Sequence, residues 1–78
     1  MDAIWVERKK KHHEGTLSVH NDELDFFDTD DRRIYCCERV RIKFIGPDGM
    51  MFTGFELAGV DKTKKPKYRY VEPYFLCR

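Results

Sequence analysis

Glutamine is missing from the sequence, and Ser18 and Asn21 are the only residues of their types. This scarcity excludes a polar low-complexity segment, which would be built largely from such residues. Long apolar runs are missing as well, since none approaches the roughly 20 residues that a helix needs to cross a bilayer. The first residues lack the apolar segment of a secretory signal peptide. We therefore expect a cytoplasmic protein that makes no membrane contact.

Cysteine is scarce, and the three present, Cys36, Cys37 and Cys77, cannot all pair within one chain. Adjacent Cys36 and Cys37 would point to opposite faces of a strand and rarely bond each other. Reduced thiols are typical of a reducing compartment, which agrees with a cytoplasmic location. We expect Cys36 to be a small buried residue, and Cys37 to lie on the outer face or against the C-terminal tail.

Neither sign of charge dominates, because 15 Lys and Arg oppose 14 Asp and Glu. The net charge of +1 provides no global field that would attract nucleic acid or a membrane. The charges are nevertheless segregated into a basic run over 8–11, a second basic run over 62–69 and an acidic stretch over 22–31. These runs either neutralise one another in the fold or form separate patches.

The chain has 78 residues, which we interpret as one domain over residues 1–78. Its hydrophobic content of 41% is too high for a disordered chain. Apolar and polar residues alternate with a period of two, and no helical stripe exceeds two turns. Strands are predicted over roughly 3–10, 16–20 and 23–27. Gly15 is predicted to mark a turn between the first two, and Asn21-Asp22 a two-residue turn before the third.

The longest predicted strand covers 34–45 and has two distinct faces. The predicted inner face is Ile34, Cys36, Val40, Ile42 and Phe44, and the outer face is Tyr35, Cys37, Arg39, Arg41 and Lys43. Glu38 interrupts the inner face, so we expect a bulge there that turns Glu38 outward.

Gly46-Pro47-Asp48-Gly49 is the strongest turn signal, because Pro47 and Asp48 suit the central positions of a type I turn. It predicts a hairpin between the long strand and a return strand over 50–57. Gly54 suggests a second bulge, which would direct Phe55 and Leu57 to the core. A charged loop over 62–67, a last strand over 67–72 and an apolar tail complete the chain. The sequence thus predicts a mostly β fold with little or no helix: a small antiparallel barrel or rolled sheet of five to six short strands, on the scale of SH3-like or OB-like barrels.

The acidic stretch resembles a metal site only in composition. A calcium loop that began at Asp28 would place Arg33 at the position of the required Gly and Arg39 at that of the bidentate Glu. Zinc ligands are normally spaced so that a turn directs both at one ion, whereas His12-His13 and Cys36-Cys37 are adjacent pairs. A small metal-binding domain is therefore the second alternative, and we expect no cofactor.

Enzyme activity is not expected. Ser18 lies within a predicted strand rather than on a sharp turn, and no glycine-rich loop is placed to hold a phosphate. No spacing pairs a nucleophile with a base.

Nucleic acid is the first alternative. Arg39, Arg41 and Lys43 repeat at period two, and Tyr68 and Tyr70 alternate with basic residues in the last strand. Small barrels bind single-stranded RNA or DNA with such combinations of basic stripes and aromatic platforms. The even balance of charge argues against strong phosphate binding, whose strength grows with each phosphate neutralised.

The function that we expect is docking on a larger protein, as a small non-enzymatic regulatory protein of the inhibitor or adaptor type. Exposed aromatics among charges are typical of protein interfaces, and segregated charges give complementarity. Small size and lack of accessory segments would also suit a phage or other mobile element, and an open sheet edge would allow a homodimer. The predicted partner-binding residues are Trp5, Asp25, Asp28, Asp30, Asp31, Arg39, Arg41, Lys43, Tyr68 and Tyr70.

Overall fold

The computed structural model describes residues 1–8 and 11–77 as an all-β fold. Its strands are β1 (Asp2–Glu7), β2 (Lys11–His20), β3 (Glu23–Asp28), β4 (Arg33–Ile45), β5 (Gly49–Val60), β6 (Pro66–Val71) and β7 (Tyr74–Cys77). The described residues contain no helix, and so none that is long and apolar enough to cross a membrane. The predicted fold class is confirmed, with one strand more than expected because the apolar tail forms β7.

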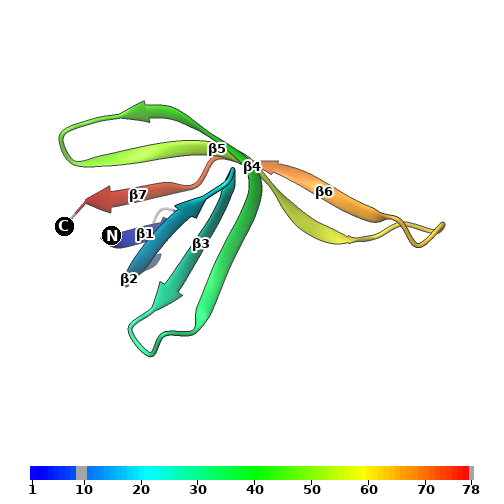
Figure 1. Cartoon of the computed structure of the whole chain (residues 1–78), viewed down its shortest axis with the longest axis horizontal. Helices are drawn as coiled ribbons and strands as arrows, with labels where there is room; N and C mark the ends of the chain where they lie inside the picture. The colour runs from blue at the N-terminus through cyan, green and yellow to red at the C-terminus, as the bar shows by residue number, and fades with distance from the viewer. Residues whose placement is uncertain (9–10, 78) are drawn as a thin grey trace.

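Six of the strands close into an antiparallel barrel. The neighbours run in the order β4-β3-β2-β1-β7-β5, and the pairing of β4 with β5 closes the ring. β7 pairs with both β1 and β5, so the C-terminal segment joins the first strand of the chain to the second half of the barrel. The two ends of the described chain therefore lie on the same side of the molecule (Figure 1).

β6 lies outside the barrel. β5 pairs with β7 up to Met51 and with β4 up to Phe55, whereas its residues from Gly54 to Val60 pair with β6. The β5–β6 hairpin consequently extends away from the barrel on the side opposite the chain ends (Figure 1). We call residues 55–71 the arm.

The core of the barrel is small and largely aromatic. Its buried residues are Ala3, Trp5, Leu17, Leu24, Phe26, Cys37, Val40, Phe52 and Phe75. Trp5 was predicted to be an exposed anchor, and this is wrong: its side chain is 7% exposed and stacks between His13 and Tyr35 at ring distances of 4.9 and 4.4 Å. The inward face of β1 buries the indole because Trp5 follows Ala3 at period two.

The register between β3 and β4 corrects the predicted faces of the long strand. Leu24 lies opposite Cys37 and Phe26 opposite Tyr35, so Cys37 and Tyr35 point inward with their buried partners. Cys37 is buried and Cys36 exposed, the reverse of the prediction.

Bulges divide β4 further along. The predicted irregularity at Glu38 is present between Glu38 and Arg41, where Arg39 takes a φ of 52°. A second one separates Ile42 from Phe44. The second bulge places Phe44 opposite Met51, so Phe44 is exposed rather than buried. Ile42 lies opposite the buried Phe52, and it is exposed because it lines an open groove.

Two further details of the prediction are wrong. The first turn does not fall at Gly15, which lies within β2; β1 ends at Glu7, and the last residues of the predicted strand, 9–10, lie outside the described range. A Cβ on Gly15 would stand 1.9 Å from the carbonyl oxygen of Phe27, so this position needs glycine for a close strand approach. Gly54 shows no bulge; the irregularity lies between Leu57 and Gly59, and Leu57 is exposed. Asn21 and Asp22, by contrast, take the positive φ predicted for their turn.

Candidate functional site

The arm has an apolar face that packs on no part of the barrel core. Phe55 lies opposite Tyr70, Leu57 opposite Tyr68, and Val60 opposite Pro66, so these side chains share one side of the two-stranded ribbon. Leu57, Val60, Tyr68 and Tyr70 are between 42% and 63% exposed. We call Phe55, Leu57, Val60, Tyr68 and Tyr70 the arm face. A cluster of large apolar side chains on a protruding hairpin is typical of a contact surface.

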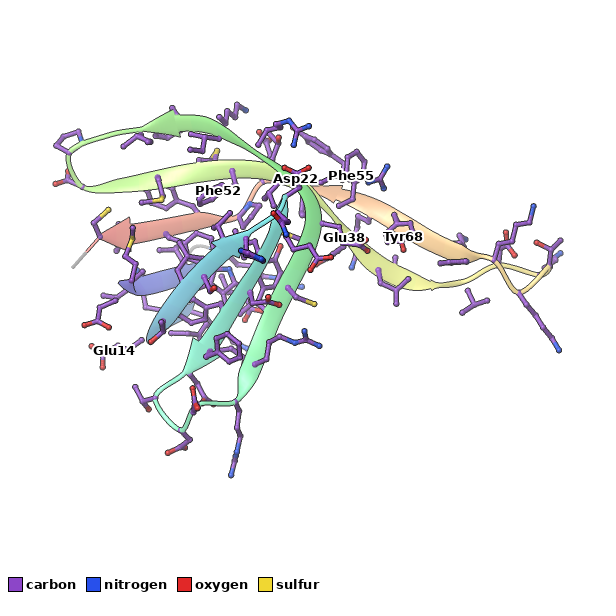
Figure 2. The ribbon with its side chains drawn as sticks, viewed as in Figure 1. Glu14, Asp22, Glu38, Phe52, Phe55 and Tyr68 are labelled. Carbon is purple, nitrogen blue, oxygen red and sulfur yellow. The ribbon has the colours of Figure 1, made fainter. Side chains whose placement is uncertain are left out.

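Arg39 fixes the root of the arm. Its guanidinium carbon lies 4.1 Å from the ring centroid of Phe55 and 5.3 Å from that of Tyr68. Phe55 also meets Tyr70 edge to face at 5.8 Å. Figure 2 shows Phe55 at the root of the arm and Tyr68 further toward its tip. Arg39 was one of the residues predicted to contact nucleic acid. The bulge instead directs its guanidinium group onto aromatic rings of its own chain.

The opposite face of the arm is polar. Arg69 donates to Glu56 through Nη2 at 2.6 Å and through Nε at 2.8 Å. Lys62, Lys64, Lys65 and Lys67 are exposed and form no ion pair with another described residue. Residues 55–71 contain five Lys or Arg and two Asp or Glu, a net charge of +3, whereas the rest of the chain contains ten and twelve, a net charge of −2. The arm is therefore the basic part of the molecule.

The loops at the tips of the β3–β4 and β5–β6 hairpins have the same backbone design. In one, the Asp28 carboxylate accepts hydrogen bonds from the backbone N–H groups of Asp30 and Arg32. In the other, the Asp61 carboxylate accepts them from Thr63 and Lys65. The fourth residue of each loop, Asp31 or Lys64, takes a positive φ. Only the charges differ: residues 28–32 carry three acids and one base, and residues 61–65 one acid and three bases.

The structure divides the predicted acidic site. Asp28 is used within its loop, and Asp25 lies 3.3 Å from Arg33 in an ion pair. Asp30 and Asp31 are exposed, and their carboxylates make no ion pair within the described part of the chain. Of the four acids predicted to bind a partner, two are therefore exposed and form no ion pair within the described residues, so the acidic site is smaller than predicted.

The predicted basic stripe on β4 is not formed. Arg39 stacks on the arm, Arg41 lies 3.2 Å from Asp22 in the β2–β3 turn, and Lys43 pairs with Glu72. The pairing with Glu72 also raises the pKa of Lys43. The two bulges send these three cations to three different partners, so they offer no continuous track for a phosphate backbone.

An apolar groove lies between β2 and the β4–β5 hairpin. Its volume is about 720 Å³, within the range of small-molecule sites, and Asp22 and Arg41 are its only charged lining residues. The apolar lining is formed by Met1, Leu17, Val19, Val40, Ile42, Ile45, Met50 and Phe52. Figure 2 shows Phe52 inside the barrel and Asp22 at the end of the β2–β3 hairpin. The exposed Ile42 and Ile45 make this groove the second apolar surface of the molecule.

The thiol of Cys37 is buried in the barrel. Burial raises the pKa of Cys37 to about 11, against a weaker lowering by a hydrogen bond from Tyr35. A thiol with such a pKa is protonated at neutral pH, and the thiolate is the nucleophilic form.

No metal site was found in residues 1–8 and 11–77: no three His, Cys, Asp or Glu side chains are placed to hold an ion. The predicted residues that the structure does bring together are Arg39 of β4 and Tyr68 and Tyr70 of the arm. Phe55, Leu57 and Val60 were missed because an exposed apolar strand reads in sequence like a buried one. The sequence signal that could have identified them is the lysine-rich loop over 62–67, because such a loop marks a hairpin tip that is exposed to solvent. Comparisons of the chain with protein-family models, with curated proteins and with solved structures found no match.

Proposed function

We propose that this chain is a small, non-enzymatic binding protein that docks on a larger protein through the arm. The single observation that supports the proposal is the arm face, whose apolar side chains lie on a hairpin outside the barrel. An isolated two-stranded hairpin is marginally stable in water. Maintaining an unburied apolar face on such an element is costly unless another surface covers it.

The composition of the arm face favours a protein as the partner. Leu57 and Val60 stand beside Tyr68 and Tyr70, and aliphatic side chains have no role in stacking on bases. Tyrosines and an arginine among apolar neighbours are typical of the residues that dominate protein–protein binding energy. An inhibitor or adaptor would need nothing more than such a surface. Its three unpaired cysteines favour a reducing compartment such as the cytoplasm.

Single-stranded nucleic acid is the second candidate, and one observation favours it. The lysines of the arm tip carry no acidic partner, and Tyr68 and Tyr70 lie on the strand that follows them. A binder of this kind would lose affinity steeply as salt rises.

The test is capture from a lysate of the source cell with matched pairs of variants. Leu57→Ser/Tyr68→Ser removes two arm-face side chains, and Ile42→Ser/Phe44→Ser removes two side chains of similar exposure on β4. We expect one stoichiometric protein partner that the β4 variant retains and the arm variant loses by at least about tenfold, as hot-spot truncations do.

Three results would contradict the proposal. The arm variant could retain the partner, or the β4 variant could lose it equally, which would move the site to the groove. Capture that disappears on nuclease treatment would favour the nucleic-acid candidate instead. Circular dichroism of both variants shows whether each remains folded.

A further inference from the structure

We infer that the arm binds an extended, acidic segment of its partner, which adds as a strand to the open edge of β6. This inference rests on the proposed function and specifies its partner. Strand addition requires an unpaired sheet edge, and contacts with alternate side chains select the partner. The arm provides both, and its charge adds a further preference.

The open edge is β6 itself. β6 pairs with β5 on one side, and no other described strand pairs with it on the other. Its six residues leave a row of backbone groups available to a further strand. The other edge of the arm, on β5, is less accessible because it faces β4 across a cleft lined by Arg33, Ile34, Tyr35, Cys36, Glu56 and Leu57.

Lysines on an edge strand often serve only to prevent aggregation. A purely protective edge would not also expose large apolar side chains. Here Tyr68 and Tyr70 alternate with Lys67 and Arg69, so the same strand presents an apolar side and a basic side. The basic side chains of the arm therefore discourage unselective strand pairing, and its apolar side chains provide a contact surface for a specific partner.

The alternation specifies the partner's side chains. On one face, a strand added beside β6 would place every second side chain against Tyr68 and Tyr70, which calls for apolar residues. On the other face, its intervening side chains would approach Lys67 and Arg69. Arg69 is already paired with Glu56, and Lys67 has no ion-pair partner among the described residues. An alternation of apolar and acidic residues satisfies both faces, and the lysines of the loop extend the attraction beyond the strand.

A second copy of this chain is a poorer occupant of the edge. Pairing β6 with β6 of another molecule would bring two arms of net charge +3 together. Like charges directly opposite in a sheet destabilise it. The charge of the arm thus selects an acidic strand over its own copy.

The experiment uses a synthetic, fluorescently labelled peptide of alternating Glu and Val, with the length of β6, and the full chain. We expect saturable binding by fluorescence anisotropy and NMR shifts centred on residues 66–71. A peptide of alternating Lys and Val, and one in which the same Glu and Val residues form two blocks, serve as sequence controls. Each control should bind at least about tenfold more weakly than the alternating Glu and Val peptide. The Lys and Val peptide lacks the negative charge, and the block peptide lacks the alternating register.

Backbone methylation tests the strand geometry. A peptide that adds as an edge strand donates hydrogen bonds to its neighbour only through alternate amides. N-methylation of one alternate set should therefore weaken binding at least about tenfold, and methylation of the other set should leave it nearly unchanged. Equal effects of the two sets, binding of the Lys and Val peptide, shifts centred on the groove, or no binding would each overturn the inference.

A matched pair of charge variants tests the basic loop. Lys65 and Arg32 occupy the same position of the two like loops, where each backbone N–H donates to the carboxylate of the first residue. Lys65→Glu should weaken binding of the Glu and Val peptide at least about fivefold at low salt, and Arg32→Glu should leave it unchanged. Equal losses would show that net charge alone attracts the peptide.

The two proposals fail in different ways. Loss of the captured partner in the arm variant, without any difference between the methylated peptides, would keep the docking function and remove strand addition. A dimer in sedimentation that Leu57→Ser abolishes would identify a second copy as the occupant and overturn the inference.

Discussion

At the scale of single residues, the buried Cys37 and the partly buried Tyr35 form a titratable pair. Both point from β4 into the barrel opposite the buried Phe26 and Leu24. Burial is the main cause that raises the pKa of each, and in Tyr35 the nearby charges of Cys37 and Glu56 raise it further. Both groups are therefore neutral in the folded protein over the whole physiological range.

We predict that the free energy of unfolding falls as the pH rises from about 8 to about 10.5. The unfolded thiol loses its proton near pH 8.5, whereas folded Cys37 keeps its proton up to about 11. In this window the folded state binds more protons than the unfolded state, so its stabilisation is present at lower pH and is lost as the pH rises. Urea unfolding at the two pH values measures the loss.

Cys37→Ala should reduce that pH dependence, because the variant has no thiol to titrate. Cys36→Ala is the matched control, since Cys36 is exposed on the same strand. Equal pH dependence in wild type and Cys37→Ala would show that burial of the thiol does not couple to folding.

The inward positions of these residues could not be predicted from periodicity alone. The prediction placed Cys36 inside and Cys37 outside, because it continued one alternation through the whole of β4. The pairing register with β3 determines which of the two cysteines points inward, and no local sequence pattern encodes that register. The interruption at Glu38 predicted a bulge, but Arg39 has no special preference for positive φ, so no residue type indicated that the alternation changes there.

The arm is the element on which the proposed function depends. Its two strands pair only with each other beyond the barrel, and Arg39 is the one side chain of β4 that is found over its aromatic rings in the described structure. An exposed contact of a guanidinium with an aromatic face contributes about 0.5–1 kcal/mol. The local stability of the arm should depend on it.

We predict that Arg39→Ala increases amide hydrogen exchange in β6 by about two- to fivefold, the equivalent of that contact energy. Arg41→Ala is the control, because Arg41 pairs with Asp22 away from the arm. NMR exchange rates of residues 66–71 provide the measurement. Unchanged rates in Arg39→Ala would mean that the strand pairing holds the arm without the stacked guanidinium.

At the scale of the elements, the period of two predicted most of the strands, and the turn residues predicted the two tight hairpins. The turn residues Asn21-Asp22 and Pro47-Asp48 act locally, so their signals survive in the sequence. β7 was predicted to be an apolar tail because Pro73 marks a break in the chain before it. Its strand conformation depends on β1 and β5, which lie far from it in sequence.

At the scale of the whole molecule, Phe75 joins the two halves of the barrel. It is fully buried, and its ring lies 5.7 Å from that of Phe26 and 5.9 Å from that of Phe52. These three residues come from β7, β3 and β5, so the core is complete only in the closed barrel. Closure by the pairing of β4 with β5 could not be read from the sequence, because it requires long-range register.

We predict that Phe75→Ala removes a large part of the stability of the domain. Truncation of a buried Phe costs about 3–5 kcal/mol, and a chain of this length has on the order of 4–12 kcal/mol in total. Phe44→Ala, the same change at a residue that is 47% exposed, should cost about 1 kcal/mol or less. Thermal unfolding followed by circular dichroism compares them, and similar losses would show that Phe75 is not central to the core.

β5 belongs to both the barrel and the arm, and it therefore determines how the two parts are joined. It is one uninterrupted strand from Gly49 to Val60, and where it leaves the barrel Gly54 packs tightly against Cys37 and Val40. The strand is therefore continuous at the point where the arm begins. Because no loop joins the two parts, we expect a partner bound on the arm to keep a defined orientation toward the barrel, and such preorganisation lowers the entropy lost when a third molecule meets both surfaces at once.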